Sequence, residues 1–209
     1  MKRNNRFITI FTLAFAIIAG AFSIRAIAAA AGLANAPVIS QVSTAAVPTA
    51  SAAVEPAPVV IDNPTHLSIP MARVDASVIP VGVTKTNNLD VPPNFVQVGW
   101  YEYGPKPGEV GNTVLDGHVD NGSTIDGVFK HLRDLKPGDD IYVTGADGSQ
   151  LHYKVDHSDV YLTSKFPSDI VFNQNNGQPT LKIITCHGTF VKATGTYDQR
   201  LVVTAYLVK

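Results

Sequence analysis

The sequence of 209 residues contains a single cysteine, Cys186. One cysteine excludes an internal disulfide and leaves too few thiols for a cysteine-based zinc site. A lone cysteine is either a buried small hydrophobic residue or a reactive thiol, and composition does not decide between the two. The sequence around Cys186 therefore has to be searched for a base and a cation.

The sequence also lacks an excess of positive charge. The formal net charge is −1, with 16 basic and 17 acidic residues. Several of the basic residues stand near the N-terminus, so acidic side chains outnumber basic ones from Asp62 onward. This distribution offers no basic patch, and nucleic acid is not an expected partner.

Charged residues are absent from one long stretch, FITIFTLAFAIIAGAFSI at 7–24, which follows Lys2, Arg3 and Arg6. As a helix it would be roughly 27 Å long, close to the thickness of a bilayer core. We therefore expect an N-terminal transmembrane helix that acts as an uncleaved signal anchor over residues 1–25. The positive-inside rule then predicts a single-pass protein of the cell membrane whose C-terminal domain is extracellular. The alternative is a cleaved signal, because the small residues at 34–36 resemble a cleavage site.

Regular structure is not expected in residues 26–60, which are rich in Ala, Pro, Val and Ser. The segment has no aromatic residue, and Glu55 is its one charged residue. Its prolines oppose helices and strands. We interpret it as a disordered linker that holds a folded domain, residues 61–209, away from the membrane.

The folded domain reads as mainly β. Short runs of β-branched and aromatic residues, bounded by Gly, Pro, Asn and Asp, predict strands at 66–69, 76–83, 89–91, 98–101, 112–116, 140–144 and 150–161. Two further strands fall within 179–205 and are joined by a glycine-containing loop. Apolar spacing predicts one helix over 125–135, and 167–172 allows a single helical turn. Many short strands with one or two short helices indicate an all-β domain built as a closed or nearly closed barrel.

His118 is the best candidate for a base. It lies in the segment DGHVD at the end of a predicted strand. A thiol needs a base or a cation nearby, because only a few per cent of a free thiol is ionised at neutral pH. His187 follows Cys186 directly, so on a continuous strand it should point to the opposite face. Arg200, at the start of the last strand, could reach the same substrate carbonyl as Cys186.

These residues together resemble the sortases, most closely those of class F. The resemblance rests on GHVD, on the downstream ITC, on the arginine fourteen residues after the cysteine, and on similar flanking phrases over roughly 65–208. It implies that Cys186 is the nucleophile, His118 the catalytic histidine and Arg200 the catalytic arginine. Thr185 matches a hydroxyl residue that contacts the substrate. His187 and Val191 depart from the usual pattern.

The resemblance implies an eight-stranded sortase-like β-barrel with cysteine transpeptidase activity. Its partners would be secreted proteins with a C-terminal LPxTG-like sorting signal and an amine acceptor, for which a peptidoglycan precursor is the expected source. No cofactor and no metal site are expected. The connection at 162–178 would border the substrate groove, with four apolar candidates for its lining: Val160, Leu162, Ile170 and Val171. Asp116 and Asp120 either orient His118 or are solvated turn residues.

Two alternatives from other functional classes stay open at this point. An L,D-transpeptidase is also an exported Cys/His enzyme, but its closely spaced glycine-rich motif is not found here. An exported β-barrel binding module without chemistry would need Cys186 only as a packing residue. The reactivity of the thiol separates a binding module from an enzyme.

Overall fold

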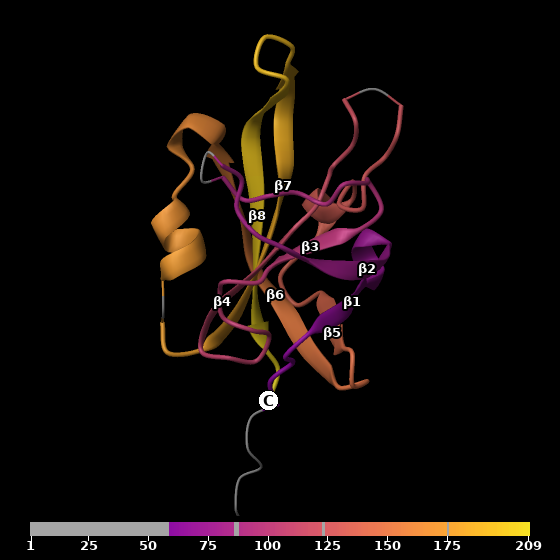
Figure 1. Cartoon of the computed structure of the whole chain (residues 1–209), viewed down its shortest axis with the longest axis vertical. Coiled ribbons are helices and arrows are strands. Elements are labelled where there is room, and N and C mark those ends of the chain that lie inside the picture. Colours follow the sequence, from indigo (N-terminus) through magenta and orange to yellow (C-terminus); the bar gives the residue numbers. More distant parts are fainter. Residues whose placement is uncertain (1–58, 86–87, 123, 175) are drawn as a thin grey trace, which may run out of the picture. The chain divides into compact units, whose positions relative to one another are not determined.

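The computed structural model describes residues 59–85, 88–122, 124–174 and 176–209 (Figure 1). The predicted transmembrane segment at 7–24 and nearly all of the linker at 26–60 lie outside the described residues. Within the described ranges, no helix is both long enough and apolar enough to span a bilayer.

Eight strands close into one barrel. This confirms the closed barrel predicted from the short apolar runs and the eight strands implied by the resemblance. Around the barrel the order is β1-β2-β3-β4-β7-β8-β6-β5, and β5 pairs back onto β1. Two of the pairings, β2 with β3 and β4 with β7, are parallel, and the others are antiparallel. The strands are β1 (Pro64–Ile69), β2 (Val74–Val81), β3 (Val98–Tyr101), β4 (Gly111–Asp116), β5 (Asp140–Gly145), β6 (Gln150–Leu162), β7 (Pro179–Val191) and β8 (Thr196–Leu207).

The barrel interior is filled by alternate residues of the strands. Along β6, for example, Leu151, Tyr153 and Val155 are buried and their neighbours are not. This period of two is what an antiparallel strand with one buried face requires. The phenol of Tyr153 is fully buried, and its oxygen accepts a hydrogen bond from the N–H of Gly108 at 2.9 Å. Burial without a charged partner raises the pKa of Tyr153 to about 12.

A second, smaller apolar cluster lies outside the barrel on β4, β7 and β8. Its buried members from the strands are Val114, Ile184 and Val202. They are covered by the connection between β6 and β7, which contains the short helices η3 (Thr163–Lys165) and η4 (Asp169–Asn173). Val171, from η4, is almost completely buried in this cluster. The cluster fixes the connection against the same strands that carry the candidate catalytic residues.

The last two strands form a long hairpin that rises beyond the barrel (yellow in Figure 1). Their pairing is continuous from Thr180 opposite Tyr206 to His187 opposite Gln199, and it shifts register before Phe190 pairs with Tyr197. Gly188 lies in this irregularity with a φ of 84°. A side chain there would also overlap Asp198, so glycine is required by both backbone and space.

The helix predicted over 125–135 is wrong. The segment forms turns, and its only helical element is the 3-10 turn η2 (Leu132–Asp134). The reason is that its backbone N–H groups bond to distant carbonyls: Val128 to Phe95 at 2.7 Å, and Phe129 to His118 at 2.9 Å. The apolar residues that suggested a helix, Phe129 and Leu132, are instead fully buried in the main core. The strand predicted at 89–91 is reduced to one isolated bridge, Val83 with Leu89.

Gly127 is the tightest point of this turn, since a Cβ there would collide with the carbonyl oxygen of His118. We expect Gly127→Ala to lower the stability by about 1–3 kcal/mol, because backbone has to move to relieve the overlap. For a domain of this size that is a loss of about 2–4 °C in Tm per kcal/mol. Thermal melts followed by circular dichroism measure it.

Gly82→Ala is the matched control for Gly127→Ala. The nearest atom to a Cβ at Gly82 is 3.2 Å away and belongs to the ring of Tyr103, which is exposed and free to shift. Equal Tm values for the two variants would show that the turn at Gly127 tolerates a side chain.

Candidate active site

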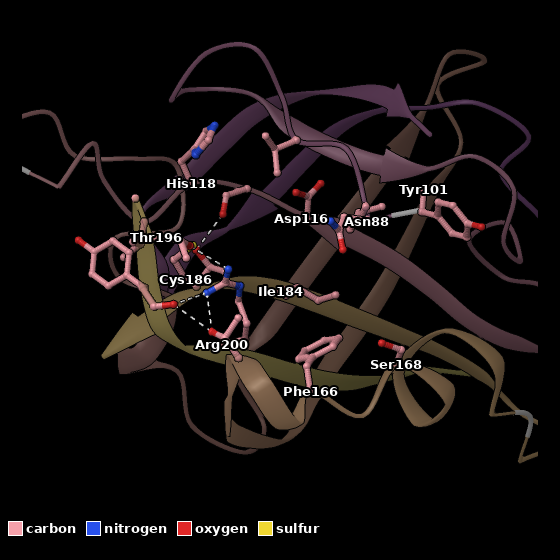
Figure 2. A pocket seen from close by; sticks show the side chains of 18 of the residues that line it. Asn88, Tyr101, Asp116, His118, Phe166, Ser168, Ile184, Cys186, Thr196 and Arg200 are labelled. Atoms are coloured by element: carbon pink, nitrogen blue, oxygen red, sulfur yellow. Dashed lines mark hydrogen bonds between the residues drawn. The ribbon is translucent and has the colours of Figure 1, made fainter. Parts of the chain in front are cut away.

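A pocket of about 1100 Å³ opens where β4, β7 and β8 meet the two loops that flank them. One wall is formed by Val83 and by residues of 88–95, and the opposite wall comes from the β6–β7 connection, residues 163–173. Figure 2 shows His118, Cys186 and Arg200 toward one end of the pocket, Tyr101 toward the other, and Asp116 and Phe166 between them. The three residues predicted to be catalytic therefore line the same pocket.

Cys186 is a half-buried residue of β7 that faces this pocket. Burial raises the pKa of its thiol above the ordinary value, and this is the largest effect on it. The charge of Arg200 and hydrogen bonds from the Thr196 hydroxyl and the Tyr197 N–H act in the opposite direction. Desolvation favours the neutral form of an acid, whereas a nearby cation favours the thiolate. At neutral pH the unliganded protein therefore holds Cys186 as a thiol.

Arg200 lies directly opposite Cys186 in the register of β7 and β8. Its guanidinium is held by four hydrogen bonds: to Thr163 Oγ1 at 3.0 Å, to Thr196 Oγ1 at 3.0 Å, and to the carbonyls of Tyr197 and Gln199 at 3.0 and 2.8 Å. All four acceptors are uncharged. Within the described part of the chain, no carboxylate forms an ion pair with Arg200, so its positive charge is left for the pocket and the thiol.

His187 points away from the pocket, as predicted from the alternation of a strand. The register shift in β7 begins only after His187, so Cys186 and His187 are consecutive residues of regular strand. Consecutive strand residues face opposite sides. Cys186 accordingly lines the pocket, and His187 is not among the described residues that do.

His118 follows β4 by two residues, and its backbone is fixed by the turn that contains Gly127. Its carbonyl accepts the N–H of Phe129, and its ring lies against Phe95 with centroids 4.6 Å apart. The Nε2 atom is 3.0 Å from the carbonyl oxygen of Pro92. Among the described residues, no hydrogen bond joins His118 to Cys186. The structure thus brings the imidazole to the wall of the pocket with one nitrogen engaged by the loop.

The two aspartates that flank His118 do not orient it. Asp120 bonds to Tyr197, to the N–H of Gly122 at 2.8 Å and to Lys130 at 3.0 Å. Burial opposes its ionisation, but these bonds prevail and lower the pKa of Asp120. Tyr197, as the donor, has its pKa raised to about 12 by the bond to Asp120. The network ties the segment after His118 to the β7–β8 hairpin.

Asp116, the last residue of β4, is buried and lies in the pocket wall. Burial, and secondarily the negative charge of Asp90, raise the pKa of Asp116 to about 8. The alternative of a solvated turn carboxylate is therefore wrong for Asp116.

Thr185 lines the pocket, but the four apolar groove candidates do not. The hydroxyl of Thr185 donates to the carbonyl of Gly117 at 2.8 Å, which joins β7 to the segment of His118. Val160 and Leu162 are exposed on β6, Val171 is buried in the second apolar cluster, and Ile170 borders a smaller pocket of about 220 Å³. The residues of the connection that line the groove are polar or aromatic. The prediction selected apolar residues, and apolar character does not tell which side of the connection faces the groove.

A sortase domain profile matches residues 67–208, which is more than half of the chain. The chain belongs to the sortase family. This confirms the resemblance seen in the GHVD and ITC segments, and membership in class F stays a prediction. No similar protein is found among curated sequences.

Solved sortases share the barrel. Sortase A from Corynebacterium diphtheriae is 24% identical with a TM-score of 0.53, and the match covers 73% of this chain and 62% of that one. Sortase C-1 from Actinomyces oris is 24% identical with a TM-score of 0.53, covering 69% and 71%. A sortase D5 transpeptidase from Clostridium perfringens is 25% identical with a TM-score of 0.51, covering 70% and 79%.

Several residues of this sortase pocket were not predicted. They are aromatic side chains from the two loop walls and from the β3 and β8 strands: Phe95, Tyr101, Phe166, Phe172 and Tyr197. The wall formed by Val83 and by residues of 88–95 was not predicted either. A signal existed, because aromatic residues in polar loops are a mark of binding surfaces. In the part of the sortase that the structure describes, no cluster of three or more His, Cys, Asp or Glu residues is placed to hold a metal ion.

The opposing effects on Cys186 predict its reactivity. We expect alkylation of the thiol by iodoacetamide to rise with pH with a midpoint above the ~8.5 of a free cysteine. Arg200→Met should move the midpoint higher still, because it removes the cation that favours the thiolate. Rates at a series of pH values, followed by intact mass, provide the measurement.

Lys192→Met serves as the charge-matched control, since Lys192 is exposed in the turn of the hairpin. It should leave the midpoint in place. A parental midpoint at or below that of free cysteine would contradict the dominance of burial.

Proposed function

We propose that this sortase is a membrane-anchored cysteine transpeptidase that cleaves a sorting signal and joins the new C-terminus to an amine. The observation that carries the proposal is the pairing of Cys186 with Arg200 in one register of β7 and β8, at the end of the pocket that His118 also lines. A nucleophile, a cation and a titratable base are the minimum set for acyl transfer through a thioester.

The reaction would proceed in two halves. Cys186 loses its proton to His118 and attacks the carbonyl before the scissile bond, and His118 then protonates the departing amine as that bond breaks. The acyl group is left as a thioester on Cys186. An incoming amine, deprotonated by His118, attacks the thioester, forms the new amide and releases the thiol. To act, the imidazole has to exchange its bond to the Pro92 carbonyl for one to the reacting groups.

Arg200 would stabilise the oxygen that becomes negative in both halves. Its guanidinium is held in place by four neutral acceptors, so little reorganisation is needed when charge develops. The proposed substrate is a secreted protein with an LPxTG-like C-terminal signal cut between Thr and Gly. The proposed acceptor is an amine of a peptidoglycan precursor, and the proposed location is the outer face of the cell membrane, with residues 7–24 as the anchor.

A binding module without chemistry is less well supported. Such a module has no need for a cation without a carboxylate partner beside a half-buried thiol. The family membership also speaks against an L,D-transpeptidase.

The catalytic assignment predicts a hierarchy among single variants. Cys186→Ala should reduce cleavage of an LPxTG-like peptide to below about a thousandth of the parental rate. His118→Ala should lose about 10²–10⁴-fold, whereas His187→Ala should lose little because it faces away from the pocket. Arg200→Lys should remain poor, because an ammonium does not reproduce the planar set of donors. Initial rates of cleavage of a fluorescent peptide test these values. If His187→Ala were slower than His118→Ala, the assignment of His118 as the base would be wrong.

The transferase step is tested by the fate of the thioester. Water is present at about 55 M, so an amine prevails only if the pocket positions it, and this is where effective molarity arises. We expect slow cleavage of the peptide alone and a new amide when oligoglycine or a diamino-acid side chain is added. Mass spectrometry identifies the product. Fast cleavage with no ligated product for any amine would identify a sorting-signal protease.

A further inference from the structure

One carboxyl in the pocket has no role in the proposed reaction. Asp116 ends β4, is only 6% exposed, and lies at a distance from the thiol toward the end of the pocket marked by Tyr101 (Figure 2). Among the described residues, its Oδ1 atom is buried without any hydrogen-bond partner. Buried polar atoms are nearly always bonded, and leaving one unbonded is destabilising. Oδ1 is packed against Gly99, so the carboxyl of Asp116 as a whole lines the pocket without a protein partner, and only a group that enters the pocket can supply one.

The neighbouring strand leaves room for this carboxyl. Gly99 of β3 pairs with Asp116, and a Cβ on Gly99 would overlap Oδ1. On the other side, Asp116 pairs with Ile184 of β7, which is apolar and lines the same pocket. Neither residue paired with Asp116 has a side chain that can form a hydrogen bond. A hydrogen-bond partner for the carboxyl therefore has to come from the pocket.

The surroundings keep this acid uncharged. Burial is the main cause that raises its pKa to about 8, and the carboxylate of Asp90 adds repulsion from the loop wall. The other titratable groups that line the pocket come from β3, the segment after β4, η4, β7 and β8: Tyr101, His118, Asp120, Asp169, Cys186, Tyr197 and Arg200. None of them bonds to Asp116. A protonated carboxylic acid has one donor, whereas a carboxylate can only accept.

We propose that the Asp116 carboxyl is a substrate-binding group that donates a hydrogen bond to a backbone carbonyl of the sorting peptide. The inference rests on the proposed function, because it needs a peptide in this pocket. It assigns to this chain a recognition residue in addition to the catalytic residues and Thr185.

The register of the sheet indicates which part of the peptide is met. Asp116 pairs with Ile184, and Ile184 precedes Cys186 by two residues. Two residues of strand correspond to about 7 Å. An extended peptide whose scissile carbonyl sits at Cys186 would thus present to Asp116 a residue about two positions away. In the proposed LPxTG-like signal that neighbourhood contains proline, which has no N–H. At the proline the backbone offers a carbonyl and no N–H, so a group that bonds to the backbone of that residue has to be a donor.

The test measures peptide binding without chemistry. The full-length Cys186→Ala protein is titrated with a dye-labelled peptide containing Leu-Pro-Ala-Thr-Gly, and anisotropy gives Kd between pH 7 and 9. With Asp116 present, Kd should rise about tenfold over this range, because a donor with a pKa of about 8 is lost. In the Asp116→Asn background Kd should stay flat, since an amide keeps a donor at every pH. Asp116→Val should bind about tenfold more weakly at pH 7, the equivalent of one lost hydrogen bond.

Asp90→Asn is the control for the electrostatic origin of the pH dependence. It leaves Asp116 in place but removes the repulsion, so the midpoint of the Kd rise should move to lower pH.

Thermal melts show that the variants fold and give an independent reading of the same group. The folded-state pKa of Asp116 lies above its unfolded value, so the parent should lose stability as pH rises from about 4 toward 8. Asp116→Asn should lack this loss and should melt at a higher temperature than the parent at pH 8.

The outcomes separate the two hypotheses. A Kd that rises equally with pH whether or not the protein carries Asp116→Asn, or that falls with pH, overturns the role of Asp116 and leaves the proposed function intact. Absence of peptide binding at every pH, together with absence of turnover by the parent, overturns the proposed function and this inference with it.

Discussion

The hydrogen-bonded register between β7 and β8 is the constraint on which the site depends. It places Cys186 opposite Arg200 with no freedom to slip, because a shift of one residue would turn every side chain of these strands to the other face. The pairing of β4 with β7 likewise fixes the end of β4, and it places the segment that contains His118 beside the segment that contains Cys186. His118 thus meets Cys186 and Arg200 because β4 and β7, which are distant along the chain, are adjacent in the barrel.

The chemistry of the site is a balance between burial and charge. Burial makes the Cys186 thiol and the Asp116 carboxyl harder to ionise, and a nearby charge acts in opposite senses on the two groups. Arg200 partly offsets burial for the thiol, whereas Asp90 adds to it for the acid. Asp120 shows the third case, in which hydrogen bonds outweigh burial and keep a carboxylate charged. The same pocket is therefore lined by a neutral thiol, a neutral carboxylic acid and an ionised carboxylate.

Most of the barrel was predictable, because β-branched runs between turn residues report on strands directly. The strand at 98–101 has the predicted bounds, the strand predicted at 89–91 is absent, and the others differ by a few residues at their ends. The absence of a helix at 125–135 was not predictable. The apolar spacing of this segment reflects the burial of Phe129 and Leu132, and its N–H groups bond to carbonyls that are brought near only by folding. For the same reason Cys186, His118 and Arg200 could be inferred from motifs, whereas the burial of Asp116 could not. That burial depends on Gly99, a residue from another strand.

The bond from Arg200 to Thr163 joins the arginine to the first turn of the β6–β7 connection. The same connection supplies one wall of the groove, so a hydrogen bond links the wall proposed to contact the peptide to the arginine proposed to stabilise the reacting oxygen. Under the proposed function, exchanging this connection for that of another sortase would change peptide selection and reaction rate together, because Thr163 lines the groove and also holds the guanidinium of Arg200.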